Sequence, residues 1–526
     1  MPPEWKEVLS STGELCRSLD LLIQRDSRAS CAGAARAENF TLGTRCAVQW
    51  EVVLLFLAAT FLYVASLVRK WRNPKCNGVL PPGSMGIPLI GETFQILIPS
   101  YSLDIHPFFT KRIKRYGTIF RTSLAGIPVV VSTDREFNDY VIQQEGKSVE
   151  LWYMNTFSKL MGMDGTSRLN EAGEVHKYIR GTLLNQFGCP TVKQLLPEMQ
   201  KFMLKSLEKW SIQPSVDMKK AAYMIRPCCS SFPLFICSAD TISKTPPEIM
   251  YGRFNKILKG LVAFSWNVPG FAFHKCVKEH NRFTNILKGI LKDRLSSKNP
   301  SCRADLIDDI IKGMKEKDFM TEDATVQLMF SAFFASFEAI SSIIEFLLTL
   351  ISENDRVIKD LIAENASIVG NGEKDGACIS WEQLKSLEFT NQVIKETLRL
   401  ANIVPGIFRR AVEDVHVKGM TIPAGWTLML VNFPVHMNPD LYINPLEFNP
   451  WCWKEIDSHT TSKNLMPFGG GIGQCLGADY SRVVLTMWKK IKGGEVFRNP
   501  LMGLKGGLHL KFSKYDEPES ASSVVN

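Results

Sequence analysis

The longest apolar run in the chain lies near its N-terminus. Residues Val52–Val68 contain no charged side chain. At 1.5 Å per residue a helix over this run is about 26 Å long, and together with Ala47–Glu51 it just spans a bilayer. Basic residues follow directly, at Arg69, Lys70, Arg72 and Lys75. Because basic flanks favour the cytoplasmic side, the pattern predicts a single transmembrane helix whose downstream end faces the cytosol. A buried core helix is the alternative interpretation.

Helical periodicity dominates from about residue 100 onward, and the longest apolar helix is expected over Glu322–Ile351. Short β-like runs predict strands at Ile119–Thr122, at Val129–Ser132, within Val415–Leu430 and near the C-terminus. We find no strand–GxGxxG–helix unit, so no flavin or nicotinamide domain is expected in this chain. The predicted fold class is mainly α with small β-sheets (α+β).

These patterns divide the chain into four parts. Residues 1–46 are expected to form an N-terminal tail that is lumenal or disordered, and residues 47–68 the transmembrane anchor. Residues 69–99 read as a basic and proline-rich linker, because proline fixes φ and glycine permits sharp turns. Residues 100–526 are expected to form one large globular domain.

Composition narrows the function classes. The chain of 526 residues has 62 basic and 53 acidic residues, a formal charge of +9 that is dispersed along the sequence. No dense Lys/Arg stripe with interleaved aromatics occurs, so we expect no nucleic-acid partner; an acidic protein or anionic lipid fits the mildly basic balance. The 13 cysteines show no CxxC pair, which indicates reduced thiols on the cytosolic side.

The strongest local motif is a glycine-rich loop around Cys475. It runs from Pro467 to Gly477, and Ala478–Met487 follows as a predicted helix. Glycines let the backbone approach a bulky planar group and aim N–H groups at the sulfur, as a metal-bound thiolate requires. Taken alone, a glycine-rich turn with a structural cysteine would be the safer interpretation.

A second motif lies about 75 residues upstream of the loop. Glu396 and Arg399 are i,i+3 neighbours on a predicted helix and can pair on one face. Such spacing alone is common on protein surfaces. Between the two motifs the chain carries the segment Pro445–Trp451, which has the pattern PxxFxP.

The order ExxR, PxxFxP and FxxGxxxCxG, with these separations, resembles the cytochrome P450 superfamily, the haem-thiolate monooxygenases. The resemblance covers the chain from Leu80 to the C-terminus, and the segments LPPGSMGIPLIGET and FASFE are similar to plant enzymes that oxidise triterpenes, sterols and brassinosteroids. It implies a cytochrome P450 fold preceded by a single N-terminal transmembrane helix, with residues 100–526 as the haem-thiolate catalytic domain.

The resemblance implies roles for the residues of the cysteine loop. Cys475 would be the thiolate ligand of the iron in haem, iron protoporphyrin IX. Phe468 would pack beside it, and Gly471 and Gly477 would permit the close turn.

The resemblance also implies partners for the haem propionates and the scaffold. His176 and Arg180 occupy the WxxxR positions, and Arg409 stands where a second propionate-binding arginine is expected. Glu396 and Arg399 would be a structural ion pair. Ordinary solvated charge is the alternative interpretation of each of these positions.

The segment Ala335–Ser341 matches the family's oxygen-activating segment. Its Glu338 would belong to the proton relay. The family pattern places a threonine after the acid, and this chain has Ala339 instead. Water, Ser341 or a hydroxyl of the substrate would then have to deliver protons.

Three further departures from the family pattern stand out. Gly473 replaces a usual arginine or histidine, and the final helix runs early into Trp488–Gly494. Cys452 replaces the arginine that completes a triad with Glu396 and Arg399, which we expect to leave Glu396 with one partner.

The function implied by the resemblance is a monooxygenase in the endoplasmic reticulum membrane, with a cytosolic catalytic domain. It would hydroxylate a large apolar terpenoid or sterol with O2 and electrons from a separate NADPH-dependent cytochrome P450 reductase, with membrane lipid as a further partner. Basic residues at Arg482, Lys489 and Lys490 are candidates for reductase docking. Candidate pocket segments are Leu151–Met163, Phe264–Phe271, Phe334–Phe337 and Ile403–Phe408.

Two alternatives remain open at this point. The missing distal threonine is compatible with a haem-thiolate isomerase or dehydratase that needs neither O2 nor a reductase. The lost polar positions are compatible with a degenerate, non-catalytic copy that binds haem or lipid.

Overall fold

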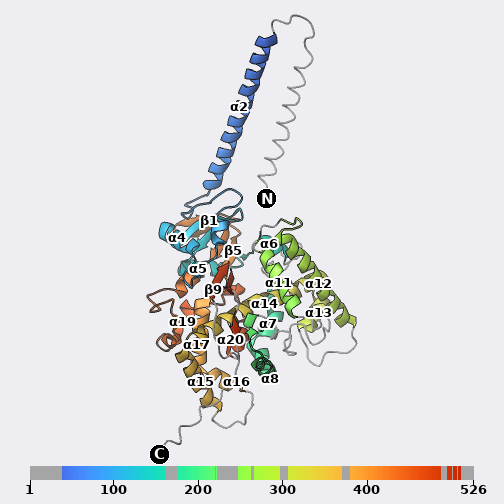
Figure 1. The fold of residues 1–526 in the computed structure, drawn as a ribbon, viewed down its shortest axis with the longest axis vertical. Coiled ribbons are helices and arrows are strands. Elements are labelled where there is room, and N and C mark those ends of the chain that lie inside the picture. The colour runs from blue at the N-terminus through green and yellow to red at the C-terminus, as the bar shows by residue number, and fades with distance from the viewer. Residues whose placement is uncertain are drawn as a thin grey trace, which may run out of the picture. The chain divides into compact units, whose positions relative to one another are not determined.

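The computed structural model describes residues 38–153, 155–160, 174–219, 221, 247–261, 263, 266–296, 306–369, 379–401, 403–486, 495–499, 501–505 and 508–510 (Figure 1). Contacts within the chain divide it into two units, Met1–Asn73 and Pro74–Asn526. Each unit is described by itself below.

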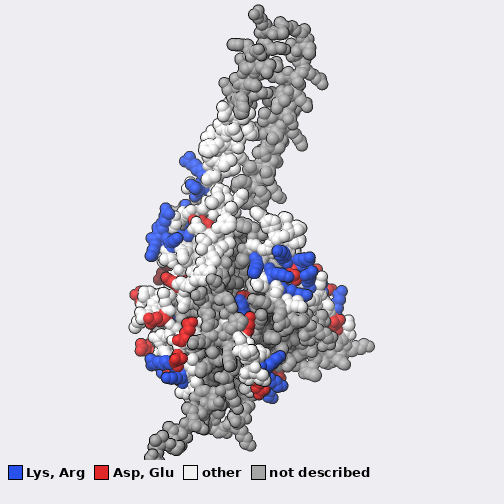
Figure 2. Space-filling model, viewed as in Figure 1, with Lys and Arg blue, Asp and Glu red and all other residues white. Residues whose placement is uncertain are grey.

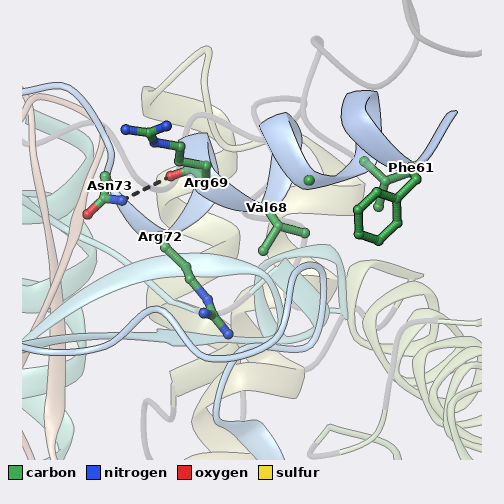
Figure 3. A pocket seen from close by; sticks show the side chains of 7 residues that line it. Phe61, Val68, Arg69, Arg72 and Asn73 are labelled. Atoms are coloured by element: carbon green, nitrogen blue, oxygen red, sulfur yellow. Dashed lines mark hydrogen bonds between the residues drawn. The ribbon is translucent and has the colours of Figure 1, made fainter. Parts of the chain in front are cut away.

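The first unit contains the apolar helix α2, Glu38–Arg72. Within it Val53–Arg72 is long and apolar enough to cross a membrane, and none of this stretch is buried. Both the backbone and the side-chain N–H of Asn73 donate to Arg69 O, at 3.0 and 3.3 Å, and end the helix (Figure 3). The shallow hollow drawn in Figure 3 is lined by residues of α2 and by Asn73. Helix α2 is therefore a candidate membrane span, in agreement with the predicted anchor.

The second unit is rich in helices. Its α-helices are α3 (Thr93–Ile96), α4 (Pro107–Tyr116), α5 (Arg135–Gln143), α6 (Asn155–Leu160), α7 (Glu174–Phe187), α8 (Cys189–Ser211), α11 (Pro247–Leu261), α12 (Ala272–Ser296), α13 (Leu306–Glu316), α14 (Glu322–Ser352), α15 (Asp355–Val369), α16 (Trp381–Ser386), α17 (Glu388–Ala401), α18 (Phe433–His436), α19 (Ser458–Asn464) and α20 (Ala478–Thr486). Two short 3-10 helices are η3 (Pro450–Lys454) and η4 (Gly471–Gly473).

The strands form small sheets. They are β1 (Ile119–Leu124), β2 (Ile127–Ser132), β3 (Val149–Leu151), β4 (Val216–Asp217), β5 (Ile407–Ala411), β6 (Val415–Val417), β7 (Met420–Ile422), β8 (Thr427–Leu430), β9 (Glu495–Asn499), β10 (Leu501–Lys505) and β11 (His509–Leu510). The largest sheet has the order β1-β2-β8-β5-β3, and only its β2–β8 pair is parallel. The pairs β9–β10, β4–β11 and β6–β7 stand apart. The predicted fold class and the strands predicted between residues 119 and 132 are thus confirmed.

Helix α14 forms the centre of the second unit. It packs against α12, α13, α15, α17, α20 and β10. Thr321 caps its start by accepting from Ala324 N at 3.2 Å, and two acidic residues follow in the first turn. The helix passes the same length and composition test as α2, but most of its apolar stretch is buried. It is therefore the core helix predicted over Glu322–Ile351.

The proline-rich segment after α2 is packed against β1. Arg121 N donates to Pro82 O at 2.8 Å, and Glu92 N donates to Ser123 O at 2.8 Å. Gly91 has a φ of +67°, and a Cβ there would lie 2.1 Å from Ser123 O. Only glycine fits so close to the neighbouring strand, so this part of the predicted linker is an ordered edge of the sheet region.

A buried ion pair joins this segment to α4. Arg112 lies 2.8 Å from Glu92, and their side chains are 8% and 10% exposed. Further hydrogen bonds hold the pair, because Arg112 also donates to Gln95 and to Phe108 O, and Thr122 donates to Glu92 Oε2 at 2.6 Å. Basic and acidic side chains are otherwise interspersed over the face of this unit drawn in Figure 2.

We predict that Glu92→Gln destabilises the folded chain by about 3 kcal/mol, because the guanidinium of Arg112 stays buried without its counter-ion. The shift of the denaturant unfolding midpoint measures the loss. Glu382→Gln is the matched control, because Glu382 pairs with Lys193 while both side chains are more than half exposed. An equal shift for the two variants would contradict a buried ion pair at Glu92.

Candidate functional site

The cysteine loop is a tight turn that precedes α20. Cys475 N donates to Phe468 O at 2.9 Å and closes the loop. Gly469 and Gly471 have φ values of +68° and +66°, a region that other residues rarely adopt. The side chain of Cys475 is exposed. The φ of Gly471 is one that favours glycine, whereas a Cβ at Gly477 would make an ordinary contact with Ser481 Oγ, at 3.9 Å.

The surroundings of Cys475 act on its thiol in opposite directions. The pKa of Cys475 is raised overall, because desolvation by the enclosing protein raises it more than the Gly477 N–H group and the positive charge of Arg180 lower it. Both lowering groups stabilise the thiolate form. A sulfur that is exposed to solvent and also faces such donors is suited to bind a metal.

A buried carboxylate holds the loop on one side. Glu145, which follows α5, accepts from Ile472 N at 2.9 Å and forms an ion pair with Arg409. The side chains of Glu145 and Arg409 are 1% and 5% exposed. On the other side, Arg180 donates to the carbonyls of Ile472 and Gln474, at 3.1 and 2.8 Å. Sequence reasoning missed Glu145, because a single acid in a loop carries no recognisable pattern.

Of the three predicted propionate partners, Arg180 and Arg409 lie next to the loop, and His176 lies on the same helix as Arg180. Arg180 on α7 and Arg409 on β5 both converge on residues 471–474. His176 lies one turn before Arg180 on α7 and is half-buried. Burial and the charge of Arg180 lower the pKa of His176, while Glu145 raises it, so the imidazole is neutral at neutral pH.

Gly473 leaves the space that Arg409 fills. A Cβ at Gly473 would lie 2.7 Å from Arg409 Nη2 and 3.1 Å from Leu151 Cδ2. The family pattern has an arginine or histidine at this position. The first carbon of such a side chain would meet the guanidinium group of Arg409. Glycine at position 473 therefore leaves room for the guanidinium group of Arg409 where it lies in this structure.

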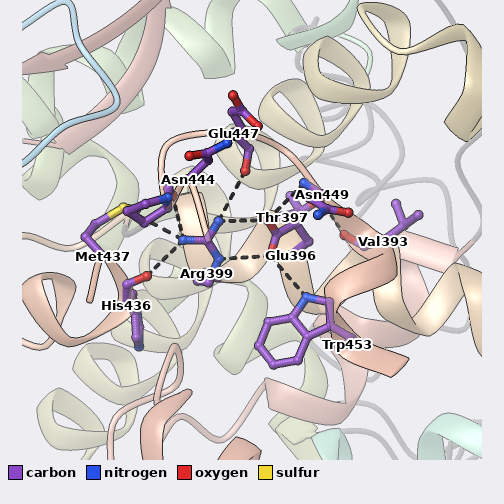
Figure 4. A network of polar contacts seen from close by, with 11 residues as sticks. Val393, Glu396, Thr397, Arg399, His436, Met437, Asn444, Glu447, Asn449 and Trp453 are labelled. Atoms are coloured by element: carbon purple, nitrogen blue, oxygen red, sulfur yellow. Dashed lines mark hydrogen bonds and ion pairs between the residues drawn. The ribbon is translucent and has the colours of Figure 1, made fainter. Parts of the chain in front are cut away.

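The Glu396–Arg399 pair is the centre of a buried network in which both carboxylate oxygens of Glu396 and all three guanidinium nitrogens of Arg399 are hydrogen-bonded (Figure 4). Among the described residues His436 Nδ1, at the edge of this network, has no partner. Arg399 donates to both carboxylate oxygens of Glu396, at 2.8 and 2.7 Å. Asn449 N and Trp453 Nε1 also donate to Glu396, at 3.1 and 3.0 Å. The expectation that Glu396 keeps only one partner is therefore wrong. The indole of Trp453 and the backbone N–H of Asn449 donate to its carboxylate in addition to Arg399.

Cys452 itself adds no charge to this network. Burial first, and then the negative charge of Glu396, raise the pKa of Cys452 to about 12. The thiol is neutral at physiological pH, so the Glu396–Arg399 cluster is neutral overall. Full satisfaction of a buried pair is what makes it tolerable in a protein interior.

The network continues toward the cysteine loop. Arg399 Nη1 donates to His436 O at 2.9 Å and to Pro445 O at 2.7 Å. The imidazole of His436 accepts from Met466 N at 3.1 Å, one residue before the loop begins. Burial and the charge of Arg399 lower the pKa of His436 to about 4, so the ring stays neutral and can accept. Arg399 thereby connects α17 to the backbone that leads into the loop.

On α14, Glu338 forms an ion pair with Lys219 at 3.0 Å. The fully buried Ser341 donates to Glu338 O in its own helix, at 3.0 Å. The adjacent Ser342 donates instead to the Glu338 carboxylate, at 3.3 Å. Sequence reasoning named Ser341 as the nearby hydroxyl, whereas Ser342 is the serine whose hydroxyl reaches this carboxylate.

Aromatic side chains join three of the four predicted pocket segments. Phe157 contacts Phe334, with ring centroids 6.5 Å apart, and stacks on Tyr153 at 4.9 Å. Trp152 packs edge-on against Phe408 at 6.1 Å. Parts of these segments, namely residues 154, 161–163, 264 and 265, lie outside the described residues, as do the side chains of 155, 336 and 337.

Comparison with known proteins identifies the family. The family model "Cytochrome P450" matches residues 81–487. This chain is a member of the cytochrome P450 family. It is 43% identical to a cucurbitadienol 11-hydroxylase of Siraitia grosvenorii and 38% identical to a β-amyrin 16-alpha-hydroxylase of Maesa lanceolata, each over 88% of this chain and 99% of the relative.

More distant matches agree with this assignment. A cholesterol 22-monohydroxylase of Paris polyphylla is 30% identical over 86% of this chain and 97% of its own. The solved structure of retinoic acid bound cyanobacterial CYP120A1 matches with a TM-score of 0.70 at 22% identity, over 82% of this chain and 99% of that one. The second unit thus has the cytochrome P450 fold.

As a cytochrome P450 the protein is a monooxygenase that uses haem with cysteine thiolate ligation, together with O2 and a redox partner. The residues present fit this cofactor. Cys475 offers a thiol at an exposed position, and the Gly477 N–H lowers its pKa. The guanidinium groups of Arg180 and Arg409 lie beside the loop, where Arg180 donates to backbone carbonyls and Arg409 pairs with Glu145. Helix α20 is described only to Thr486, and residues 487–494, which include the predicted early end, lie outside the described residues.

We predict that Trp453→Phe destabilises this cytochrome P450 by about 1–3 kcal/mol, because one donor to the buried Glu396 carboxylate is lost. Denaturant unfolding measures the loss. Trp451→Phe is the control, because the Trp451 indole donates to the part-buried Asp360 at 3.0 Å instead. A loss for Trp453→Phe no larger than for the control would contradict the role given to the indole.

We predict that Gly473→Ala lowers both the stability of the haem-free protein, by about 1–3 kcal/mol, and its haem content, because the new Cβ displaces Arg409. Gly477→Ala should leave the stability of the haem-free protein unchanged, since its Cβ enters open space. Unfolding curves and haem per protein measure the two effects. If Gly473→Ala keeps the stability and the haem content of the original protein, the contact between this position and Arg409 is not tight.

Proposed function

We propose that this cytochrome P450 hydroxylates a large apolar triterpenoid or sterol. The proposal is supported by the relatives at 43% and 38% identity, which are named for hydroxylation of cucurbitadienol and β-amyrin. The aromatic groups around Phe157 offer an apolar wall of the kind a rigid polycyclic substrate requires. We further propose that electrons come from a separate NADPH-dependent reductase.

We propose Cys475 as the axial ligand of the haem iron. Haem bound through a thiolate supplies the chemistry of O2 activation. In this chain, Gly477 N–H stabilises the sulfur, and Arg180, Arg409 and His176 lie where they can hold the propionates. Glu145 keeps Arg409 in place while accepting from the loop.

The observation that carries the proposal is the intact connection from Glu396 through Arg399 and His436 to the cysteine loop. A degenerate, non-catalytic copy would be under no constraint to keep the buried Glu396–Arg399 ion pair, whose two side chains are each 1% exposed. The replacement of the expected arginine by Cys452 leaves the network complete, which argues against that alternative.

We propose that the protein lies in the endoplasmic reticulum membrane with its catalytic domain in the cytosol. The candidate span in α2 and its basic end at Arg69, Lys70 and Arg72 support this orientation, with membrane lipid as a partner. Arg482 on α20 is more than half exposed and lies over the ring of Phe468 at 5.2 Å. It remains a candidate for reductase docking; Lys489 and Lys490 lie outside the described residues.

One further candidate function rests on Ala339. Without a threonine at this position, a haem-thiolate isomerase or dehydratase would need no proton delivery to bound oxygen. The ion-paired Glu338 and the hydroxyl of Ser342 on its carboxylate favour the monooxygenase, because they place polar groups on α14 that such a reaction would not use.

We predict that the full-length protein, supplied with a plant reductase, NADPH and isotopically labelled O2, adds one labelled oxygen atom to cucurbitadienol, β-amyrin or cholesterol. Mass spectrometry of the products measures the label. Cys475→Ser should abolish the product, and Cys452→Ser should retain it. A product that forms without NADPH and carries no label would establish the isomerase or dehydratase instead, and absence of haem from the folded protein would refute both.

A further inference from the structure

One row of residues on the core helix α14 is accessible. Ala335 is exposed, and Gln327, Ser331 and Ala339 are half-buried, although most of the apolar stretch of this helix is buried. The four residues stand at positions i, i+4, i+8 and i+12, so they follow one ridge of the helix. Because a helix rises 1.5 Å per residue, the row is about 18 Å long. An extended molecule can therefore lie along α14 from Gln327 to Ala339.

The two ends of this row differ in their chemistry. Ala339 belongs to the segment that matches the family's oxygen-activating segment, so we place the proposed reaction at this end. Ala335, one turn earlier, is also small and apolar. Ser331 uses its hydroxyl within the helix, since it donates to Gln327 O at 2.8 Å. The side-chain amide of Gln327 is therefore the polar group at the end of the row that is remote from the reaction.

Aromatic rings flank the row between its ends. Phe334, next to Ala335, lies 6.5 Å from Phe157 of α6 and 5.8 Å from Phe330, measured between ring centroids. Phe330 in turn meets the imidazole of His280 edge-on at 4.5 Å. Rigid aromatic surfaces of this kind pack well against a fused-ring skeleton. The row thus combines an apolar middle with one polar end, which matches the chemistry of a polycyclic alcohol.

The hydrogen bonds of Gln327 leave one polar atom for a ligand. Its Nε2 donates to the carbonyl of Leu160 at the end of α6 and lies 3.4 Å from Nε2 of His280 on α12. Burial lowers the pKa of His280, so the ring is neutral at neutral pH, and its Nδ1 donates to Asn281 Oδ1 at 3.4 Å. The Nε2 of this tautomer accepts a hydrogen bond. Both amide hydrogens of Gln327 are therefore used, and among the described residues no donor reaches its Oε1.

We propose that Gln327 binds the hydroxyl group of a polycyclic alcohol substrate and thereby determines which carbon of that substrate reaches the reacting end of the row. The substrate O–H donates to Gln327 Oε1, and the ring skeleton lies along α14 toward Ala339. Leu160 O and His280 hold the amide in this orientation. The inference rests on the proposed function and deepens it, since cucurbitadienol and cholesterol, which appear in the names of two relatives, are alcohols.

The free atom of Gln327 predicts a specific discrimination. Its Oε1 only accepts hydrogen bonds, and its two amide hydrogens are already donated. A ketone with the same ring skeleton has the same shape but no hydrogen to donate. The site should therefore prefer the alcohol to the ketone, whereas a purely apolar pocket would bind the two about equally.

Equilibrium dialysis with cucurbitadienol, cholesterol and the ketone of each tests this preference on the full-length protein. We expect each alcohol to bind about five- to ten-fold more tightly than its ketone, because the ketone lacks one hydrogen bond. Gln327→Met should abolish the preference by weakening the binding of the alcohol alone. Gln200→Met is the matched control and should keep it: Gln200 is also half-buried, and its amide donates to a backbone carbonyl, that of Ile379, at 3.0 Å.

Two results of the binding experiment would overturn the proposal. One is an unaltered protein that binds ketone and alcohol equally well. The other is an equal loss of affinity for both ligands in Gln327→Met, because it would show that this residue only holds α6 and α12 against α14.

The position of oxidation gives a test that requires no variant. We expect the alcohols to give one main hydroxylated product and the ketones a mixture, because a skeleton without this hydrogen bond can slide along the row. Gln327→Met should give a similar mixture from the alcohols. A protein that hydroxylates alcohol and ketone at the same carbon would overturn the inference and leave the proposed function standing, whereas a protein that binds neither class would overturn both.

Discussion

The Glu396 carboxylate is the group on which the arrangement of α17, the segment around η3 and the chain that leads into the cysteine loop depends. It is fully buried and accepts from Arg399, from the backbone of Asn449 and from the indole of Trp453. These donors come from α17 and from the segment around η3, and Arg399 reaches on to the carbonyl of His436. Removal of Arg399 would leave a buried charge uncompensated, and removal of a neutral donor would cost one hydrogen bond to the carboxylate. The relative placement of these segments, and of the loop they support, is therefore fixed by one ion pair and its hydrogen bonds.

The cysteine loop depends on a second, smaller set of charges. Glu145 pairs with Arg409 and accepts from Ile472 N, while Arg180 donates to the carbonyls on the other side of the turn. The glycine at 473 belongs to the same arrangement, since a larger residue would collide with Arg409. Trp453 therefore supplies the donor to Glu396 that is lost with an arginine at position 452, and Arg409 fills the space that Gly473 leaves.

Much of this could be predicted from the sequence, because the signals were local. The periodicity of α14, the strands β1 and β2, the Glu396–Arg399 motif and the glycine-rich loop around Cys475 are each contained in one short stretch. The contacts of Glu145, Trp453 and Ser342 could not be predicted, since they join residues far apart in the chain or depend on which way a helix face turns. The expectation that Glu396 lacks a partner was wrong for this reason: the absence of an arginine at position 452 is visible in the sequence, whereas only the fold shows that the indole of the next residue, Trp453, donates to Glu396.

The central claim is that the network around Glu396 supports a cysteine loop able to bind haem through Cys475 despite the loss of the family arginine. The carbon monoxide difference spectrum of the reduced full-length protein tests this most directly. A strongly red-shifted Soret band that is lost in Cys475→Ser is the predicted result. A blue-shifted band in the unaltered protein, or folded protein without haem, would contradict the account.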